Sequence, residues 1–207
     1  MKSYSIVLII GVIVTFLYSV FHDLKLRKKR KQVLEELTIA LMKGDNQKYE
    51  IILSDNQGMF PRFNLAYLQL ENEIAQNNYS NIRKSLADFE QAKLNKKQKK
   101  ALYGMLFNYF MAQGHYKEGG TCLKKLKEDG VTESVHHCEI IYDTLAENGS
   151  AYIDEVLKRV ETESGEKRLR STYLLSKMYA NQGDLLNARK YEQEVQENII
   201  ALLQTQA

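Results

Sequence analysis

The residues with the greatest potential for metal or acid–base chemistry are the run His136-His137-Cys138-Glu139, together with Cys122. Imidazole nitrogens and thiolates are the ligands of structural zinc sites. Consecutive residues of a helix point about 100° apart, so four in a row do not converge on one tetrahedral ion. We therefore interpret the run as a buried Cys138 beside surface histidines, and we expect no metal and no other cofactor.

Motifs of enzyme chemistry are otherwise missing from the sequence. It has no glycine-rich phosphate-binding loop, no nucleophile elbow and no zinc-protease helix. Two cysteines in 207 residues form no disulfide framework and fit a reducing compartment. We therefore expect no catalytic activity, and the next question is which elements could position a binding surface.

Apolar residues recur in five copies that are about 34 residues apart. The copies begin at Leu34, Tyr67, Tyr103, Cys138 and Thr172, so the intervals are 33, 36, 35 and 34 residues. Within most copies the apolar side chains follow at steps of three and four, which places them on one helical face. A period of this length is typical of stacked helical hairpins that share a continuous core.

A short polar turn separates the two helices expected in each copy. Gly and Asn accept the left-handed conformation that ends many helices, and Asp or Ser can cap the next helix. The five turns are Lys43-Gly44-Asp45, Gln76-Asn77-Asn78, Gln113-Gly114-His115, Asn148-Gly149-Ser150 and Gln182-Gly183-Asp184. One proline, no tryptophan and no sustained period-two alternation favour helix nearly throughout.

The third and fifth copies follow the spacing Trp-x-x-Leu-Gly-x-x-Tyr and then Ala-x-x-x-Phe. The matching residues are Tyr103, Leu106, Phe110 and Leu123 in the third copy and Leu175, Ser176, Tyr179 and Ala188 in the fifth. On these residues the chain resembles the tetratricopeptide repeat (TPR) over about residues 33–198. The resemblance implies an all-α fold, a right-handed solenoid of about five TPR-like helical hairpins. The alternative is an ordinary helical bundle with coincidental spacing.

The sequence also departs from the TPR signature. Thr172 and Cys138 stand where a bulky aromatic residue is usual, Glu192 replaces the Phe, and no copy carries the closing Pro. In the fourth copy, Ile141, Tyr142 and Leu145 fit the first helix, but the second helix is out of phase at Ile153, Leu157 and Val160.

In the TPR family the first helix of each repeat lines a concave groove. Carried onto this sequence, the resemblance implies a partner-binding groove at Asn72, Asn108, Glu139, Asp143, Arg170, Tyr173, Lys177 and Asn181, with Glu147 continuing the acidic stripe. Asn side chains can hydrogen-bond an extended peptide backbone. Gly104 stands where the family's carboxylate clamp has Lys, which argues against capture of a C-terminal carboxylate. Either the acidic and basic stripes pair with each other, or they bind a peptide.

The N-terminal residues 4–22 predict one transmembrane helix behind a short extracytoplasmic N-terminus, residues 1–3. Tyr4 to Phe21 is 18 residues without a charge, and twelve of them are Ile, Val, Leu or Phe. At 1.5 Å per residue this length approaches the roughly 30 Å hydrocarbon core of a bilayer. A cleaved signal peptide is the alternative, but only Lys2 precedes the segment and no Ala-x-Ala-like site follows it.

A polybasic segment, residues 23–32, follows the predicted membrane helix. Its cations are Lys25, Arg27, Lys28, Lys29, Arg30 and Lys31. The positive-inside rule therefore predicts a single-pass protein of the cell (plasma) membrane with its C-terminal domain in the cytoplasm. Residues 32–207 hold 22 basic and 25 acidic residues, a formal charge of −3. We expect no nucleic-acid partner, because such proteins carry a basic folded face.

Two other segments stand out by their composition, one rich in lysine and one apolar. The lysine run Lys93, Lys96, Lys97, Lys99 and Lys100 is interpreted as a solvated turn between two hairpins, with contact to an acidic partner or lipid as the alternative. The C-terminal residues Ile199, Ile200, Leu202 and Leu203 are apolar where a solenoid usually ends in a polar face. They are expected to fold back over the last hairpin or, as the alternative, to dock against a second copy.

Together these patterns predict a membrane-anchored protein–protein interaction scaffold or adaptor. Its TPR-like helical domain over residues 33–207 would bind a protein or peptide partner in the cytoplasm. Two alternatives stay open. One is a self-assembling structural membrane protein that forms a homodimer through its C-terminal apolar segment. The other is an exported binding protein, if the N-terminal segment is cleaved.

Overall fold

The computed structural model describes residues 24–205 of the chain. The predicted transmembrane helix, residues 4–22, lies outside this range. Within the described residues, no helix combines the length and the apolar character needed to cross a membrane.

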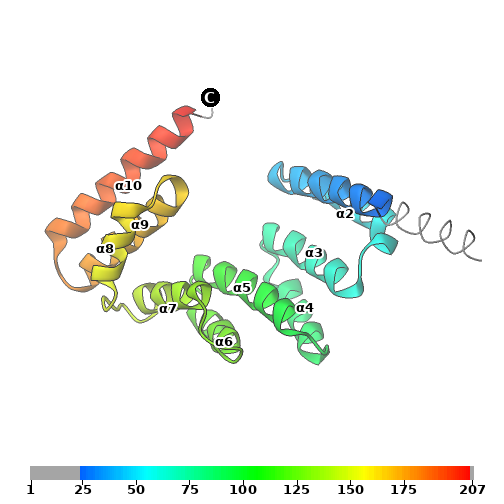
Figure 1. Cartoon of the computed structure of the whole chain (residues 1–207), viewed down its shortest axis with the longest axis horizontal. Coiled ribbons are helices and arrows are strands. Elements are labelled where there is room, and N and C mark those ends of the chain that lie inside the picture. Colours follow the sequence, from blue (N-terminus) through cyan, green and yellow to red (C-terminus); the bar gives the residue numbers. More distant parts are fainter. Residues whose placement is uncertain (1–23, 206–207) are drawn as a thin grey trace, which may run out of the picture. The chain divides into compact units, whose positions relative to one another are not determined.

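Over residues 24–205 the fold is all-α and resembles a helical repeat, as the periodicity predicted, and it has no β-strand there (Figure 1). A helix over residues 24–42 comes first. The elements that follow are α2 (Asn46–Asn56), the 3-10 helix η1 (Gln57–Met59), α3 (Arg62–Ala75), α4 (Tyr79–Gln91), α5 (Lys96–Ala112), α6 (Tyr116–Lys127), α7 (Glu133–Ala146), α8 (Ile153–Thr162), α9 (Gly165–Asn181) and α10 (Leu185–Thr205).

All five predicted turns separate successive helices, and each contains one residue in the left-handed conformation. These residues are Gly44 (φ 67°), Asn77 (φ 53°), Gly114 (φ 73°), Asn148 (φ 53°) and Gly183 (φ 83°). Three of the turns also cap the next helix, since the side chains of Asp45, Asn78 and Asp184 each accept a hydrogen bond from a backbone N–H three residues on. The fourth turn differs, because α8 begins only after Tyr152.

The chain divides into two compact units, one that ends at Lys93 and one that begins at Leu94. In the N-terminal unit, the helix over 24–42 packs with α2 and α3 around a core of Val33, Leu37, Ala40, Tyr49, Leu53 and Leu68. The buried Tyr49 hydroxyl donates a 2.8 Å hydrogen bond to the Leu68 carbonyl oxygen. The six cations of the predicted polybasic segment lie in the same continuous helix, so no boundary separates them from the first hairpin.

The C-terminal unit contains the helices α5 to α10. Helix α5 packs closely with α6, and α9 with α10. From Leu102 onward, α5 carries most of its buried residues, including Leu102, Leu106, Phe107 and Phe110. In the last copy, Tyr179 of α9 and Tyr191 of α10 stack their rings with centroids 5.6 Å apart.

The fourth copy is packed differently from the others. Helix α8 makes its main backbone contacts with α9, and Ile140, Val156, Val160, Leu174, Leu175 and Met178 form one cluster of α7, α8 and α9. The buried face of α7 carries Ile140 and Thr144, while the expected core residues Ile141 and Leu145 are only partly buried. The buried face of α7 is thus rotated by about one residue from the expected one, so the fit of the first helix of this copy to the repeat did not identify its buried face.

Two expectations about the ends of elements were wrong. The lysine run is not a turn, because α5 begins at Lys96 and four of its five lysines lie in the first two turns of that helix. The C-terminal apolar residues do not fold back as a separate segment. They continue α10 to Thr205, and Ile199 and Ile200 are 43% and 55% exposed.

Candidate functional site

An open groove of about 1130 Å³ lies within the C-terminal unit, between α5, α7, α9 and α10. Three of these, α5, α7 and α9, are the first helices of their pairs, the helices that the TPR resemblance assigns to a groove. Its apolar lining includes Met111, Leu126, Val135, Cys138, Ile141, Leu145, Leu169, Leu174, Val195 and Ile199. A largely apolar concave surface of this size is a typical binding site.

Three large side chains that line the groove are solvent-exposed. Tyr116 of α6 is 39% exposed, Tyr173 of α9 is 42% exposed and Ile199 of α10 is 43% exposed. Tyrosine combines a large apolar surface with a hydroxyl that can bond a partner, and it is enriched in protein interfaces. The groove therefore offers apolar contact area without any rearrangement of the core.

The charges that line the groove are all positive. Lys100 and Arg170 are among its lining residues, and no Asp or Glu of the described chain is. Arg170 contacts Glu166 at 3.3 Å, and the Lys100 ammonium donates to the Thr132 hydroxyl at 3.2 Å. This excess of positive charge is a local feature of the groove, since residues 94–207 as a whole contain sixteen acidic and sixteen basic residues.

A second, smaller cavity of about 300 Å³ adjoins the groove at the start of α5. It shares Lys100, Leu126 and Val135 with the groove, so the two cavities have a common wall. Its cations are Lys96, Lys97, Lys99, Lys100 and Lys125, and we call these five residues the lysine cluster. Asp129, 3.8 Å from the Lys96 ammonium, is the one carboxylate in its lining.

Only part of the predicted binding set lies in the groove. Asn108, Arg170 and Tyr173 line it. Lys177 lies beside it, with its ammonium 5.3 Å from the centre of the Tyr173 ring. This distance is within the range of a cation–π contact, so Lys177 holds the face of the tyrosine.

The acidic residues predicted for the groove lie elsewhere on α7. Glu139, Asp143 and Glu147 line a separate cavity of about 450 Å³ that also involves α6 and Tyr152. Glu139 pairs with Lys127 of α6 at 2.6 Å. None of the ion pairs within residues 24–205 joins this acidic stripe to Arg170 or Lys177.

The two remaining predicted residues, Asn72 and Asn181, do not line the groove. Asn181 donates from Nδ2 to the carbonyl oxygens of Thr144 and Gly149, both at 2.9 Å, and so holds the end of α7. Asn72 is 5% exposed and lines a polar cavity of about 550 Å³ in the N-terminal unit. It therefore lies in another unit of the chain from the groove.

Several groove residues were not predicted. Cys138, Ile141 and Leu145 were assigned to the core of the fourth copy, but they line the groove because the face of α7 is rotated. Consecutive helical residues point about 100° apart, so a shift of one residue moves Glu139 out of the groove as it brings Cys138 in. The phase break in the second helix of this copy was the signal that could have found the shift.

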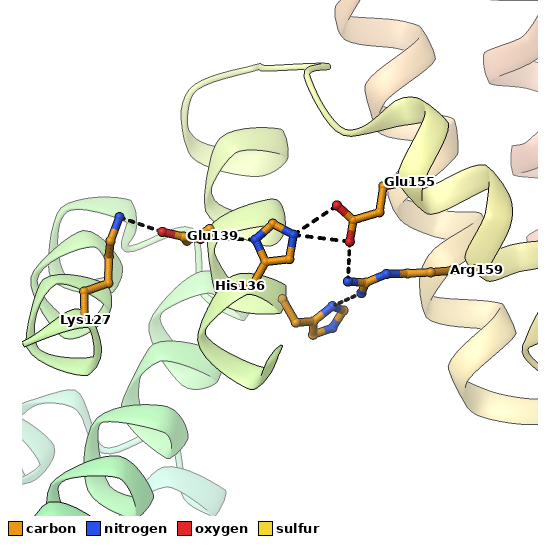
Figure 2. Close-up of polar contacts among 6 residues, drawn as sticks. Lys127, His136, Glu139, Glu155 and Arg159 are labelled. Atoms are coloured by element: carbon orange, nitrogen blue, oxygen red, sulfur yellow. Dashed lines mark hydrogen bonds and ion pairs between the residues drawn. The ribbon is translucent and has the colours of Figure 1, made fainter. Parts of the chain in front are cut away.

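The face of α7 is fixed by a network of polar contacts that joins α6, α7 and α8 (Figure 2). His136 lies with Nδ1 3.2 Å from Glu139 Oε2 and with Nε2 2.9 Å from Glu155 Oε2. Arg159 donates to Glu155 Oε1 at 2.6 Å. The network holds in place the helix that carries the groove residues.

The two adjacent histidines differ in charge in this network, since His136 is cationic and His137 is neutral. Both nitrogens of His136 face carboxylates, which only accept hydrogen bonds, so both nitrogens carry protons. Hydrogen bonds to Glu155 and Glu139 raise the pKa of His136. The Nδ1 of His137 lies 3.0 Å from the Arg159 guanidinium, which only donates, so Nδ1 accepts and the ring is neutral. Burial, with help from Arg159, lowers the pKa of His137.

Cys138 is not poised for thiol chemistry. Burial raises the pKa of its thiol to about 11, with a smaller contribution from Glu139. A thiol with such a pKa is almost entirely protonated at neutral pH, and the thiolate is the form that binds metals and attacks electrophiles. No group of three or more potential ligands within residues 24–205 could hold a metal ion.

Comparison of the chain with protein-family models, with curated proteins and with solved structures finds no match.

Proposed function

We propose that the protein is a membrane-anchored interaction scaffold whose C-terminal groove binds a segment of another protein. The observation that carries this proposal is the open, apolar groove between α5, α7, α9 and α10, with Tyr116, Tyr173 and Ile199 exposed in it. Apolar side chains that stay exposed in a concave surface mark interaction sites. The TPR-like arrangement, in which first helices line the groove, supports the same function.

The membrane anchor is part of this proposal. Residues 4–22 would cross the membrane once, and the cations between Lys25 and Lys31 would keep the helical units in the cytoplasm. A reporter enzyme fused after Ala207 tests the orientation. Activity of the fusion only outside the cytoplasm would contradict it, and a mature protein that begins after residue 22 would replace the anchor with an exported protein.

The binding function is tested by photocrosslinking in intact cells. A photoreactive amino acid placed at Tyr173 reports on the groove, and the same residue placed at the exposed Lys158 of α8 is the matched control. We expect crosslinks to another protein from position 173 that are missing from position 158. If neither position gives a crosslink to another protein, the scaffold function is wrong.

Self-assembly is a second candidate, because Ile199 and Ile200 leave an apolar strip exposed near the end of α10. In that case the probe at position 173 would crosslink two copies of this chain. Light scattering of the purified full-length chain in detergent gives an independent measurement. A monomer would contradict self-assembly and leave the binding of another protein as the function.

A further inference from the structure

We infer that the groove of the C-terminal unit binds an acidic amphipathic segment of a partner protein. Apolar side chains of the segment would fill the groove, and its carboxylates would contact the lysine cluster at the start of α5. The inference rests on the proposed function, since it specifies the partner of the same groove.

The shape and the lining of the groove favour an apolar helical face on the partner. Its side chains come from five helices, α5, α6, α7, α9 and α10, and about half of the lining residues are apolar. An amphipathic helix recognises such a surface by laying apolar residues at steps of three and four into the groove. Tyr116 and Tyr173, from α6 and α9, supply rigid aromatic contacts with such a segment.

The distribution of charge in and beside the groove favours an acidic partner. A formally neutral stretch of chain places Lys100 and Arg170 in the lining of the groove, which contains no carboxylate of the described residues, while Glu166 contacts Arg170 at 3.3 Å from outside the lining. The lysine cluster then continues the positive surface beyond the shared residues Lys100, Leu126 and Val135. A partner with carboxylates at one end matches this distribution, whereas a basic partner would face like charges.

The lysines of the cluster are also unfavourable for the helix that carries them. The N-terminus of a helix bears a partial positive charge, so anions stabilise it and cations destabilise it. The first turn of α5 has no acidic residue and begins with Lys96 and Lys97. In α6, α7, α8 and α9 the first turn holds at least one Asp or Glu, whereas the first turn of α10, like that of α5, holds none. Carboxylates of a bound segment would supply the missing negative charge.

The experiment uses three fluorescent synthetic peptides with the same apolar helical face. They carry a block of Glu, of Gln or of Lys at one end, and each is made with the block at either terminus. Binding to the full-length chain in nanodiscs of uncharged lipid is followed by fluorescence anisotropy, with empty nanodiscs as the blank. We expect the Glu peptide to bind at least about tenfold more tightly than the Gln peptide, which corresponds to about 1.4 kcal/mol.

A charge reversal makes the result directional. In Lys97→Glu/Lys100→Glu we expect the preference to invert, with the Lys peptide now bound more tightly than the Glu peptide. The change places acids at the start of α5, where they favour the helix, so unfolding does not explain a loss of binding. Lys158→Glu/Lys167→Glu changes the net charge equally at exposed positions outside the groove and should keep the wild-type preference.

Three outcomes would overturn the inference. The first is equal binding of the Glu and Lys peptides. The second is an unchanged preference in the charge-reversed variant. The third is that none of the peptides binds, and if the chain is then dimeric or binds a fluorescent fatty acid, the occupant of the groove is a second copy or a lipid. Crosslinks from position 173 to another protein would still support the scaffold function in the first two cases, so the two failures are distinguishable.

Discussion

The imidazole Nε2 of His136 lies 2.9 Å from Oε2 of Glu155, and this pair ties α7 to α8 across the loop of residues 147–152. The backbones of α7 and α8 make few direct contacts, because α8 packs mainly on α9. The pair is therefore one of the side-chain contacts that set the position of α7, and with it the position of Cys138, Ile141 and Leu145 in the groove.

The stability of the protein should depend on the protonation of His136. The pKa of His136 is raised above its usual 6.5, so its contribution is fully present below pH 6.5 and is lost as the pH rises through the raised pKa. The variant His136→Gln should therefore be less stable than wild type by about 1 kcal/mol at about pH 5.5. The difference should shrink towards zero at about pH 8.5, as measured by chemical unfolding followed by circular dichroism.

The carboxylates of the same network set the acid limit of this effect. Hydrogen bonds to His136 and to Lys127 lower the pKa values of Glu155 and Glu139, respectively, below their usual 4.5. Their contribution is present above pH 4.5 and is lost as the pH falls through the lowered pKa values. Glu155→Gln should reproduce the loss at about pH 5.5. A destabilisation by His136→Gln that stays constant from acid to alkaline pH would contradict this account.

Asn181 should matter for stability, although the TPR resemblance placed it in the binding set. Its Nδ2 donates to the carbonyl oxygen of Thr144 in the last turn of α7, where carbonyl groups have no partner within their own helix, and to that of Gly149 in the loop that follows. Asn181→Ala should lower the free energy of unfolding by about 1 kcal/mol. Asn181→Asp should cost more, because a carboxylate cannot donate. The control is Asn108→Ala, at an exposed groove position, which should stay within about 0.5 kcal/mol of wild type in the same denaturation experiment.

Gly114 should be difficult to replace for reasons of backbone conformation alone. It has φ 73° in the turn between α5 and α6, and a Cβ added there would meet no atom within 4 Å. Gly114→Ala should lower the free energy of unfolding by about 1 kcal/mol, because alanine disfavours positive φ. Gly114→Asn should cost less, since Asn77 and Asn148 adopt the same conformation in equivalent turns of this chain. Equal losses for Ala and Asn in thermal unfolding would indicate a different cause.

Asn72 should tolerate an apolar replacement. The side chain is 5% exposed, and its Oδ1 atom is buried without a hydrogen-bond partner among the described residues. Replacing a buried, unpaired polar group by an apolar one of similar size removes a desolvation cost. Asn72→Leu should therefore be neutral or stabilising by up to about 1 kcal/mol in urea denaturation. Asn72→Asp should destabilise the protein by about 2 kcal/mol or more, and a clear loss of stability in Asn72→Leu would disprove this reading of the site.

The helices and the turns between them could be predicted from the sequence, because both depend on interactions between residues that are close along the chain. Steps of three and four place apolar residues on one face of a helix, and this pattern predicted the buried Leu106, Phe110 and Leu175. Only a few residue types readily adopt the left-handed backbone conformation, and this restriction predicted the turns at Gly44, Gly114 and Gly183.

Which face of each helix meets its neighbours depends on packing between helices and could not be predicted from the sequence. A helix with apolar residues on more than one face can be rotated by one residue at small local cost, and the choice depends on the partners available. In α7, Ile140 packs against α8 and α9. With this face buried, Cys138 lines the groove and Glu139 contacts Lys127 instead. Packing between residues far apart in sequence made that choice, and the repeat pattern alone could not assign the lining of the groove.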